Sequence, residues 1–234
     1  MRAGIIQSNY IPWRGYFDFI DSVDVFVILD DAAFSKGSHR NRNQLKFADG
    51  LRWLTVPVNV HLNVPIDEVL IDTRKSDWPV RHERLLHESL DAAPFFADAL
   101  ALWRSGVGSA ETRLSPLNMR LIRILCEYLG IRTRLLDARP LGAAGTSTER
   151  VIDLLRKLDA DAYLSGPSAQ DYIDEDLFRK NKIRLEYKTY DYEPYPQRHG
   201  DFVGAVSVLD LIANTGPEAR RYLKSLTPDQ VAVA

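Results

Sequence analysis

The pattern that most constrains the fold of this chain lies in residues 3–31, AGIIQSNYIPWRGYFDFIDSVDVFVILDD. It begins with an apolar run over residues 3–6 and ends with a second apolar run over residues 25–29. Between them, apolar side chains recur at the i, i+3, i+4 and i+7 spacing of one helix face, and they are Trp13, Tyr16, Phe17 and Ile20. Two apolar runs around an amphipathic helix are typical of a strand–helix–strand unit, because parallel strands are covered on both faces.

Polar side chains follow both apolar runs, at the points where the predicted strands end. Parallel strands end at one edge of a sheet, and ligands of such sheets bind outside that edge. Taken one at a time, these residue types also cap helices and end strands with no further role. Their common position predicts a ligand site at this edge, and the residues concerned are Gln7, Ser8, Asn9, Asp30 and Asp31.

Apolar runs and helical patterns alternate through most of the remaining chain. We predict further strands over residues 51–58, 69–72, 131–136, 162–164 and 183–189. We predict helical segments over residues 76–106, 115–130, 146–158 and 207–216. This order predicts a mainly parallel α/β sheet with helices on both faces, in a Rossmann-like three-layer architecture.

Local patterns refine the ends of these elements. Ser115, followed by a proline, predicts a helix N-cap, and Thr146 with Glu149 predicts a capping box. Alternation over residues 183–189 predicts a strand with one solvent-facing side, and the tail from Thr227 is expected to be loose.

The chain length bounds the number of domains. At 234 residues it is long enough to bury a substantial core within one domain. We expect a single α/β domain over residues 1–234, in which the helical segment of residues 76–130 forms a sub-lobe.

Composition excludes several classes of partner. A formal net charge of −2 gives no general reason to expect nucleic acid or a membrane surface as a partner. No apolar run approaches the roughly 20 residues that a bilayer-spanning helix needs. The single cysteine, Cys126, cannot form an internal disulfide and fits a reducing compartment. We therefore expect a cytoplasmic protein.

The polar segment of residues 30–43 ends in five consecutive residues, HRNRN, after a predicted strand end. Such a run is most often a solvated basic loop, and without interleaved aromatic residues it does not favour nucleic acid. Arginine nevertheless binds phosphate or carboxylate at two points, and an imidazole serves as a general base near neutral pH. We therefore predict that Arg42 and Lys36 hold phosphate and that His39 accepts a proton.

Two later segments have both a structural and a functional interpretation. Ser165 and Ser168 follow a predicted strand, but the segment lacks the lysine and the glycine spacing of a phosphate-binding P-loop. The loop YEPYPQRHGDF is either a proline-stiffened surface loop or a wall over a polar ligand. In the second case Tyr195 and Gln197 contact the ligand, and His199 is an alternative general base.

The histidines do not form a metal-binding pattern. His82 lies on an apolar helix face, where a hydrogen-bonded core histidine is the simpler explanation. His87 is five positions further on and therefore lies on another face, and His61 stands alone. We expect neither a metal nor a cofactor. No G-x-S-x-G elbow and no early G-x-G-x-x-G occur, which disfavours a hydrolase elbow and a standard dinucleotide fold.

Several blocks of the sequence resemble the WbqC-like proteins of bacteria. The chain has QSNYIPWRGYFDFI, VFVILDDAAFSKGSHRNRN and WLTVPV in that order, and later YLSGPSAQDY, PYPQRHGDF and SVLDLIANTGPEA. The family pattern begins Q-P-x-Y-x-P-W-x-G-Y-F, so this chain departs from it at Ser8 and Asn9. The resemblance implies a role in O-antigen or related surface-polysaccharide biosynthesis, in which an acyl or aminoacyl group is transferred to an amino sugar.

Residues and resemblance together define a set of candidate site residues. The candidate catalytic residues are His39, His199, Asp30 and Asp31. The candidate substrate-binding residues are Gln7, Tyr10, Trp13, Lys36, Asn41, Arg42, Asn43, Ser165, Ser168, Tyr195 and Gln197.

The leading functional hypothesis is a transferase that acts on a small molecule. The expected partners are a nucleotide-linked sugar and an acyl donor on a carrier protein, without nucleic acid or membrane. Two alternatives remain open, namely a nucleotidyltransferase-like enzyme and a non-catalytic protein that binds a sugar or nucleotide.

Overall fold

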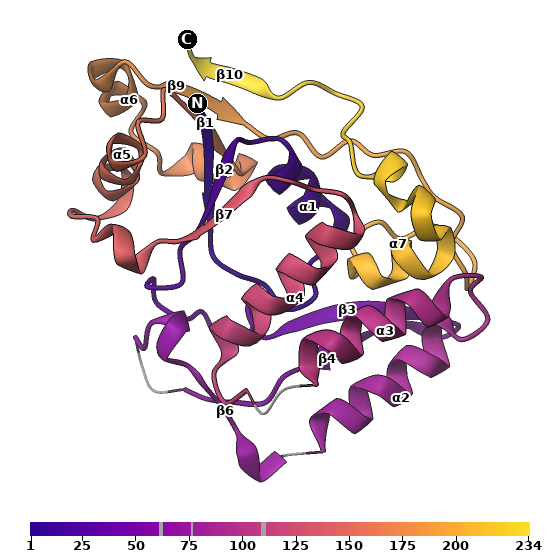
Figure 1. Cartoon of the computed structure of the whole chain (residues 1–234). Helices are drawn as coiled ribbons and strands as arrows, with labels where there is room; N and C mark the ends of the chain where they lie inside the picture. The colour runs from indigo at the N-terminus through magenta and orange to yellow at the C-terminus, as the bar shows by residue number, and fades with distance from the viewer. Residues whose placement is uncertain (61–62, 76, 109–110) are drawn as a thin grey trace.

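The computed structural model describes residues 1–60, 63–75, 77–108 and 111–234. Within these residues, one sheet contains six strands in the order β10-β9-β8-β1-β2-β7 (Figure 1). Its strands are β1 (Arg2–Ile6), β2 (Val25–Ile28), β7 (Arg134–Asp137), β8 (Ala162–Ser165), β9 (Arg184–Tyr187) and β10 (Gln230–Val233). All neighbouring pairs are parallel except β10 with β9. The sheet is therefore mostly parallel, as the sequence predicted.

The predicted strand–helix–strand unit is confirmed. Helix α1 (Arg14–Asp21) connects β1 to β2, and the two strands pair in parallel register from Ala3↔Val25 to Ile6↔Ile28. Gly4 allows the helix to lie close to the sheet, because a Cβ atom at this position would be 2.4 Å from Cε1 of Phe19. A side chain at residue 4 would therefore push α1 away from β1.

The order of strands changes direction next to β1. From β1 the chain adds β2 and then β7 on one side, and it returns to add β8 and β9 on the other side. The carboxyl ends of β1 and β8 consequently point to the same edge while their following segments diverge. In open parallel sheets this switch point is where ligands bind.

Two hydrophobic clusters cover the sheet on its two faces. One contains buried residues of α1 and of α4 (Leu114–Tyr128), such as Phe19 and Leu121, together with Phe26 of β2. The other contains buried residues of α5 (Ser147–Lys157) and α6 (Glu175–Asn181), such as Leu155 and Phe178. Successive buried side chains of β2 belong alternately to the one cluster and to the other.

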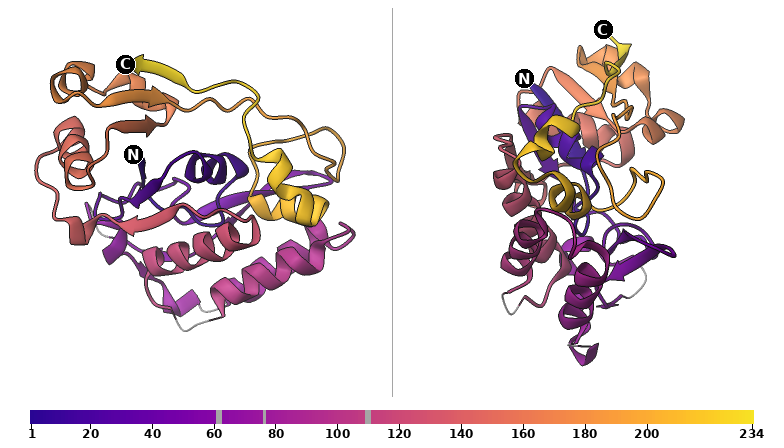
Figure 2. Two further views of the ribbon diagram at one scale, coloured as in Figure 1. Left: turned by 45° about the horizontal axis from the view of Figure 1, so that its top comes forward. Right: turned by 90° about the vertical axis from the view of Figure 1, so that its right-hand side faces the viewer.

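A second part of the molecule lies outside this sheet. Strands β3 (Arg42–Phe47) and β4 (Gly50–Thr55) form an antiparallel hairpin, and β5 (Val58–Asn59) pairs with β6 (Leu70–Ile71). The hairpin packs against α2 (Trp78–Leu90), while α3 (Phe96–Val107) packs against α4 and α7 (Val208–Thr215). In Figures 1 and 2, helices α2 and α3 lie at the end of the molecule opposite to β10 and α6.

The hairpin corrects one sequence-based expectation. The strand predicted over residues 51–58 ends before Pro57, and it pairs only with β3, which the sequence analysis did not predict. The helical segment predicted from residue 76, which itself lies outside the described residues, consists of two helices with a break at Asp91–Phe95.

Four local predictions differ from the structure. Helix α4 begins at Leu114, so that Ser115 lies within its first turn instead of capping it. Thr146 is the N-cap of α5, but its side chain makes no capping hydrogen bond. The tail is not loose, because β10 pairs with β9. The polar side of the strand predicted over residues 183–189 is solvated only at Arg184, because Glu186 and Lys188 are buried among ion pairs.

Within the described ranges, no helix has the length and the apolar character that crossing a bilayer requires.

Candidate functional site

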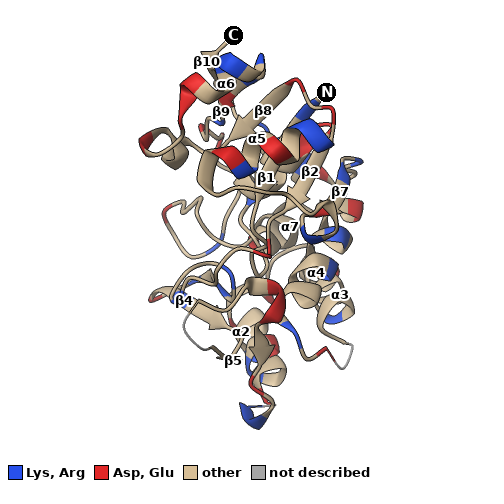
Figure 3. Cartoon of the chain, turned by 90° about the vertical axis from the view of Figure 1, so that its left-hand side faces the viewer, with Lys and Arg blue, Asp and Glu red and all other residues tan. Residues whose placement is uncertain are grey.

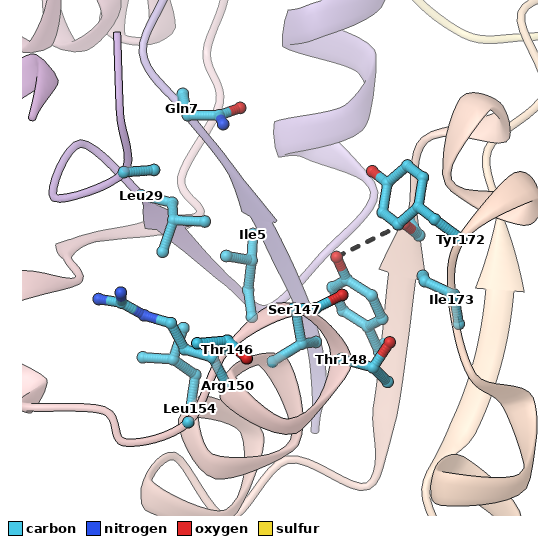
Figure 4. Close-up of a pocket in the computed structure, with 15 residues that line it drawn as sticks. Ile5, Gln7, Leu29, Thr146, Ser147, Thr148, Arg150, Leu154, Tyr172 and Ile173 are labelled. Carbon is cyan, nitrogen blue, oxygen red and sulfur yellow. Dashed lines mark hydrogen bonds between the residues drawn. The ribbon is translucent and has the colours of Figure 1, made fainter. Parts of the chain in front are cut away.

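A pocket of about 340 Å³ lies at the carboxyl ends of β1 and β8, at the switch point of the sheet. We call it the switch-point pocket. Strand β1 and its following segment contribute Ile5 and Gln7, β8 contributes Tyr163 and Ser165, and the segment after β8 contributes Tyr172. In Figure 4, Tyr172 and Ile173 lie on one side of the pocket and Arg150 lies on the other.

The first turn of α5 forms another wall of this pocket. Residues 145–148, Gly-Thr-Ser-Thr, line it (Figure 4). The backbone bends sharply here, with φ angles of 82° at Gly145 and 49° at Ser147. First-turn amides of a helix have no partner within the helix, and the side chain of Thr146 does not cap them. The free amides at a helix N-terminus bind anions such as phosphate.

The remaining walls are mainly apolar, with hydroxyl groups at one end. Leu29, Val151 and Leu154 add apolar surface to that of Ile5. The hydroxyl oxygens of Ser165 and Tyr163 are 3.5 Å apart, and burial raises the pKa of Tyr163 to about 12. The tyrosine is therefore a neutral hydrogen-bonding group at physiological pH. The pocket can accommodate a ligand with an apolar or planar part, hydroxyl groups and an anionic group.

The two strand-end aspartates have different surroundings. Asp31 forms an ion pair with Arg150, which lines the switch-point pocket. Asp30 is buried and accepts hydrogen bonds from the Ser8 amide at 2.8 Å, the Ser8 hydroxyl at 2.6 Å and the Ser115 hydroxyl at 2.5 Å. Burial raises the pKa of Asp30, and these hydrogen bonds oppose the rise. Asp30 thus fixes the segment after β1 to α4 and does not line the pocket.

A second pocket, of about 390 Å³, contains three of the residues predicted to bind substrate, Lys36, Asn41 and Arg42. We call it the Arg42 pocket. Arg42 lies over the ring of Trp53, with its guanidinium carbon 4.0 Å from the ring centroid. Asn41 donates a hydrogen bond of 2.8 Å to the Val56 carbonyl, which holds the loop to β4. Asn41 and Arg42 are therefore engaged by the hairpin and the segment that follows it.

A third pocket, of about 160 Å³, is lined by Asn9, Trp13, His39, Asn43 and Ala205. We call it the His39 pocket. Partial burial and the nearby Arg40 and Arg42 lower the pKa of His39, so its imidazole is neutral at pH 7 and able to accept a proton.

Trp13 is a rigid wall of the His39 pocket. A Cβ atom at Gly15 would lie 2.3 Å from Cζ2 of Trp13, so the indole rests directly on the glycine. The ring of Tyr190, with its centroid 5.1 Å from that of the indole, packs against Trp13 as well. The side chain of Asn43 is held in place by the 2.8 Å hydrogen bond that it donates to the Ile11 carbonyl.

The other predicted residues lie elsewhere. Tyr10 is buried in the core. Tyr195 and Gln197 donate to Asp210, at 2.7 and 2.8 Å, and thereby fix the loop that contains them. His199 contacts the Ser89 carbonyl of α2 through Nε2 at 2.8 Å. Ser168 is exposed on the short 3-10 helix Pro167–Asp171.

The structure places further residues at or next to these pockets, beyond those predicted from the sequence. The first turn of α5 was interpreted only as a helix start, although GAAGTST combines glycines with hydroxyl side chains before a helix. Arg150 has no signal in the sequence beyond its place in a predicted helix. Arg40, part of HRNRN, donates hydrogen bonds to the side-chain carbonyls of Gln7 and Asn9. The sequence alone gives no reason to prefer Arg40 over Arg42 as a ligand-binding residue, because both lie in the same polar run.

The described residues contain no group of three or more His, Cys, Asp or Glu side chains that could hold a metal ion. His61 lies outside the described residues.

Comparison with known proteins gives a family relationship. The model of the WbqC-like protein family matches residues 7–222. The chain is 45% identical over 228 residues to the uncharacterized protein Rv1507c of Mycobacterium tuberculosis, covering 95% of this chain and 97% of that protein. No solved structure matches this chain significantly. A family match over most of the sequence and a relative of this similarity lead to one conclusion: the chain belongs to the WbqC-like protein family.

Proposed function

We propose that this protein is a transferase that binds a nucleotide-linked amino sugar in the switch-point pocket and attaches an acyl or aminoacyl group to it. The observation that supports this most directly is the start of α5, which has no side-chain cap and whose residues line a partly apolar pocket at the switch point of a mostly parallel sheet. We also infer a Rossmann-like three-layer arrangement from the strand order and from the helical clusters on the two faces.

The proposed ligand matches the pocket by chemistry. The nucleotide phosphates lie against residues 145–148, and the apolar walls contact the base. The hydroxyl groups of Tyr163 and Ser165 hydrogen-bond with sugar hydroxyls. Acidic and basic positions are interspersed along α5 (Figure 3), so within this helix the first-turn amides, and not a basic face, attract phosphate.

The second substrate is assigned to the His39 pocket. Gln7 lines the switch-point pocket and Asn9 lines the His39 pocket, so the short segment after β1 contacts both. The sugar amine attacks the carbonyl carbon of a carrier-bound thioester, the new C–N bond forms and the C–S bond breaks. His39 accepts the proton of the amine and passes it to the departing thiolate. His199 is a weaker candidate for this base, because its Nε2 already contacts the Ser89 carbonyl.

Isothermal titration calorimetry with uridine, thymidine, guanosine and cytidine nucleotide sugars tests the binding site. Thr146→Glu places a carboxylate at the N-terminus of α5, where it is compatible with the helix dipole but repels phosphate. We expect at least about tenfold weaker binding for Thr146→Glu, equivalent to about 1.4 kcal/mol, and nearly unchanged binding for the matched neutral variant Thr146→Gln. Equal affinities for Thr146→Glu and wild type would refute the proposed site.

The two alternative functions are distinguished by product analysis. Release of pyrophosphate from a nucleoside triphosphate would replace the proposed reaction with nucleotidyl transfer. Tight binding of a nucleotide sugar without any acylated product, in the presence of acyl-carrier thioesters, would favour a binding protein.

A further inference from the structure

The side chain of Arg40 spans the segment that follows β1. One terminal nitrogen of its guanidinium donates a 2.8 Å hydrogen bond to Oε1 of Gln7, and the other donates to Oδ1 of Asn9. Gln7 lines the switch-point pocket and Asn9 lines the His39 pocket. The Arg40 guanidinium therefore contacts one lining residue of each pocket, and this position between Gln7 and Asn9 is the junction of the two pockets.

The charge of Arg40 has no ion-pair partner among the described residues. Both of its side-chain hydrogen bonds go to neutral amide oxygens. Some other partly buried arginines pair with carboxylates, as Arg2 does with Glu186 and Arg150 does with Asp31. Arg14 has no carboxylate partner either, but its charge lies over the rings of three aromatic residues, which are Tyr192, Tyr195 and Phe202. The two hydrogen bonds use two of the five N–H groups of a guanidinium, which leaves three for a ligand.

Burial makes this unpaired charge unfavourable. It lowers the pKa of Arg40, although a guanidinium stays protonated at any physiological pH. The carboxylate that raises this pKa, Asp30, already accepts hydrogen bonds from the hydroxyl groups of Ser8 and Ser115. A partly buried cation without a counter-ion is destabilising unless an anion is bound next to it.

The surroundings hold Arg40 in place before any ligand arrives. Asn118 of α4 donates hydrogen bonds to the Arg40 carbonyl at 2.8 Å and to the Ser8 hydroxyl at 3.1 Å. The Tyr10 amide donates to the carbonyl of the preceding residue, His39, at 3.0 Å. Backbone and guanidinium are thus both fixed, which is the preorganisation that an anion-binding group requires.

We propose that Arg40 binds an anionic oxygen group of a substrate at the junction of the two pockets, in place of Arg42, which stacks on Trp53. The inference rests on the proposed function for the identity of the substrates. The anion is a phosphate, which belongs either to the nucleotide in the switch-point pocket or to the phosphopantetheine arm of an acyl donor in the His39 pocket.

Calorimetry with two probes, uridine diphosphate and 4′-phosphopantetheine, tests this role in the full-length protein. We expect Arg40→Gln to weaken the binding of at least one probe by about tenfold or more. Arg40→Lys should retain about a third of the wild-type affinity for that probe, because a lysine keeps the charge but not the two-point geometry. Arg123, exposed on α4, provides the matched control Arg123→Gln, which should bind both probes like wild type. The probe that is affected identifies the source of the phosphate.

Wild-type protein provides a measurement that does not depend on a variant. Labelling with phenylglyoxal should modify Arg40, and saturating amounts of the bound probe should protect it. Unchanged probe affinity in Arg40→Gln, or loss of binding in Arg42→Gln instead, would overturn the inference. If Thr146→Glu weakens binding and Arg40→Gln does not, only the role of Arg40 fails. If Arg40→Gln weakens binding and Thr146→Glu does not, the proposed site at α5 fails and Arg40 remains an anion-binding residue.

Discussion

Tyr10, a predicted substrate-binding residue, instead belongs to a buried chain of hydrogen bonds. Its hydroxyl accepts from Nε1 of Trp103 at 2.9 Å and lies 2.9 Å from Nδ1 of His82. Nε2 of His82 lies 3.2 Å from the Thr55 carbonyl, which can only accept. The proton of the imidazole is therefore on Nε2, and Tyr10 donates to Nδ1. Every group of the chain is satisfied only while His82 is neutral.

This arrangement predicts a pH-dependent stability. Burial lowers the pKa of His82 from 6.5 to about 4. As pH falls below 6.5, His82 takes up a proton in the unfolded chain but stays neutral in the folded protein. The contribution of His82 to the free energy of unfolding is therefore complete above pH 6.5 and is lost progressively down to about pH 4. At ~1.4 kcal/mol per pKa unit, the loss is about 3 kcal/mol. Urea unfolding between about pH 7 and pH 4.5 should show a steeper decline for wild type than for His82→Gln. Parallel declines would contradict the assignment.

Single residues also show where sequence-based prediction of the site reached its limit. The core position of His82 was predictable because its neighbours form an apolar helix face. Arg40 and Arg42 were indistinguishable in HRNRN, since both are arginines in one polar loop. Their roles depend on Gln7, Asn9 and Trp53, which the fold brings to the loop from other segments.

Among the elements, β9 and β10 depend most on contacts that are distant in sequence. The alternating polar residues of β9 are covered by an ion-pair network. Nζ of Lys188 lies 2.8 Å from Asp18 and 3.1 Å from Asp229, and Asp229 also pairs with Arg2 at 2.8 Å. Strand β10 therefore anchors both the first strand and the end of the sheet.

Removing one carboxylate from this network should destabilise the protein. In Asp229→Asn, Lys188 keeps Asp18 as a partner, so we expect a loss of roughly 2–3 kcal/mol, somewhat below the ~3–5 kcal/mol for breaking an isolated buried pair. A chain that ends at Thr227 lacks β10 as well and should lose more. Urea unfolding measures both. Wild-type stability in the shortened chain would mean that β10 contributes nothing, as expected for a loose tail.

Elements were predictable where their pattern was local. The unit β1–α1–β2 and helix α7, with its N-cap at Ser207, follow from contiguous apolar patterns and turn residues. Strand β3 was missed because its sequence, RNQLKF, is half polar, and it is stabilised by pairing with β4 and by packing against α2. Strand β10 was missed because its pairing with β9 joins residues far apart in the sequence.

At the scale of the whole molecule, the order of the strands determines where the candidate site lies. The mostly parallel sheet was predicted from alternating strands and helices, and Gln7, one of the polar residues at the predicted strand ends, lines the switch-point pocket. The sequence did not predict that the candidate residues would be divided among three pockets and positions outside them. That distribution arises because the β3–β4 hairpin lies outside the sheet, together with Lys36, Asn41 and Arg42.

Hydrogen exchange of the full-length protein, with and without a bound nucleotide sugar, tests the central claim most directly. A ligand in the switch-point pocket should slow amide exchange in residues 145–149 and 165–173, because it covers the first turn of α5 and the segment after β8. Residues 195–200, which contain His199, should exchange unchanged. Slower exchange confined to residues 36–42 or 195–200, with residues 145–149 unaffected, would contradict a ligand site at the switch point.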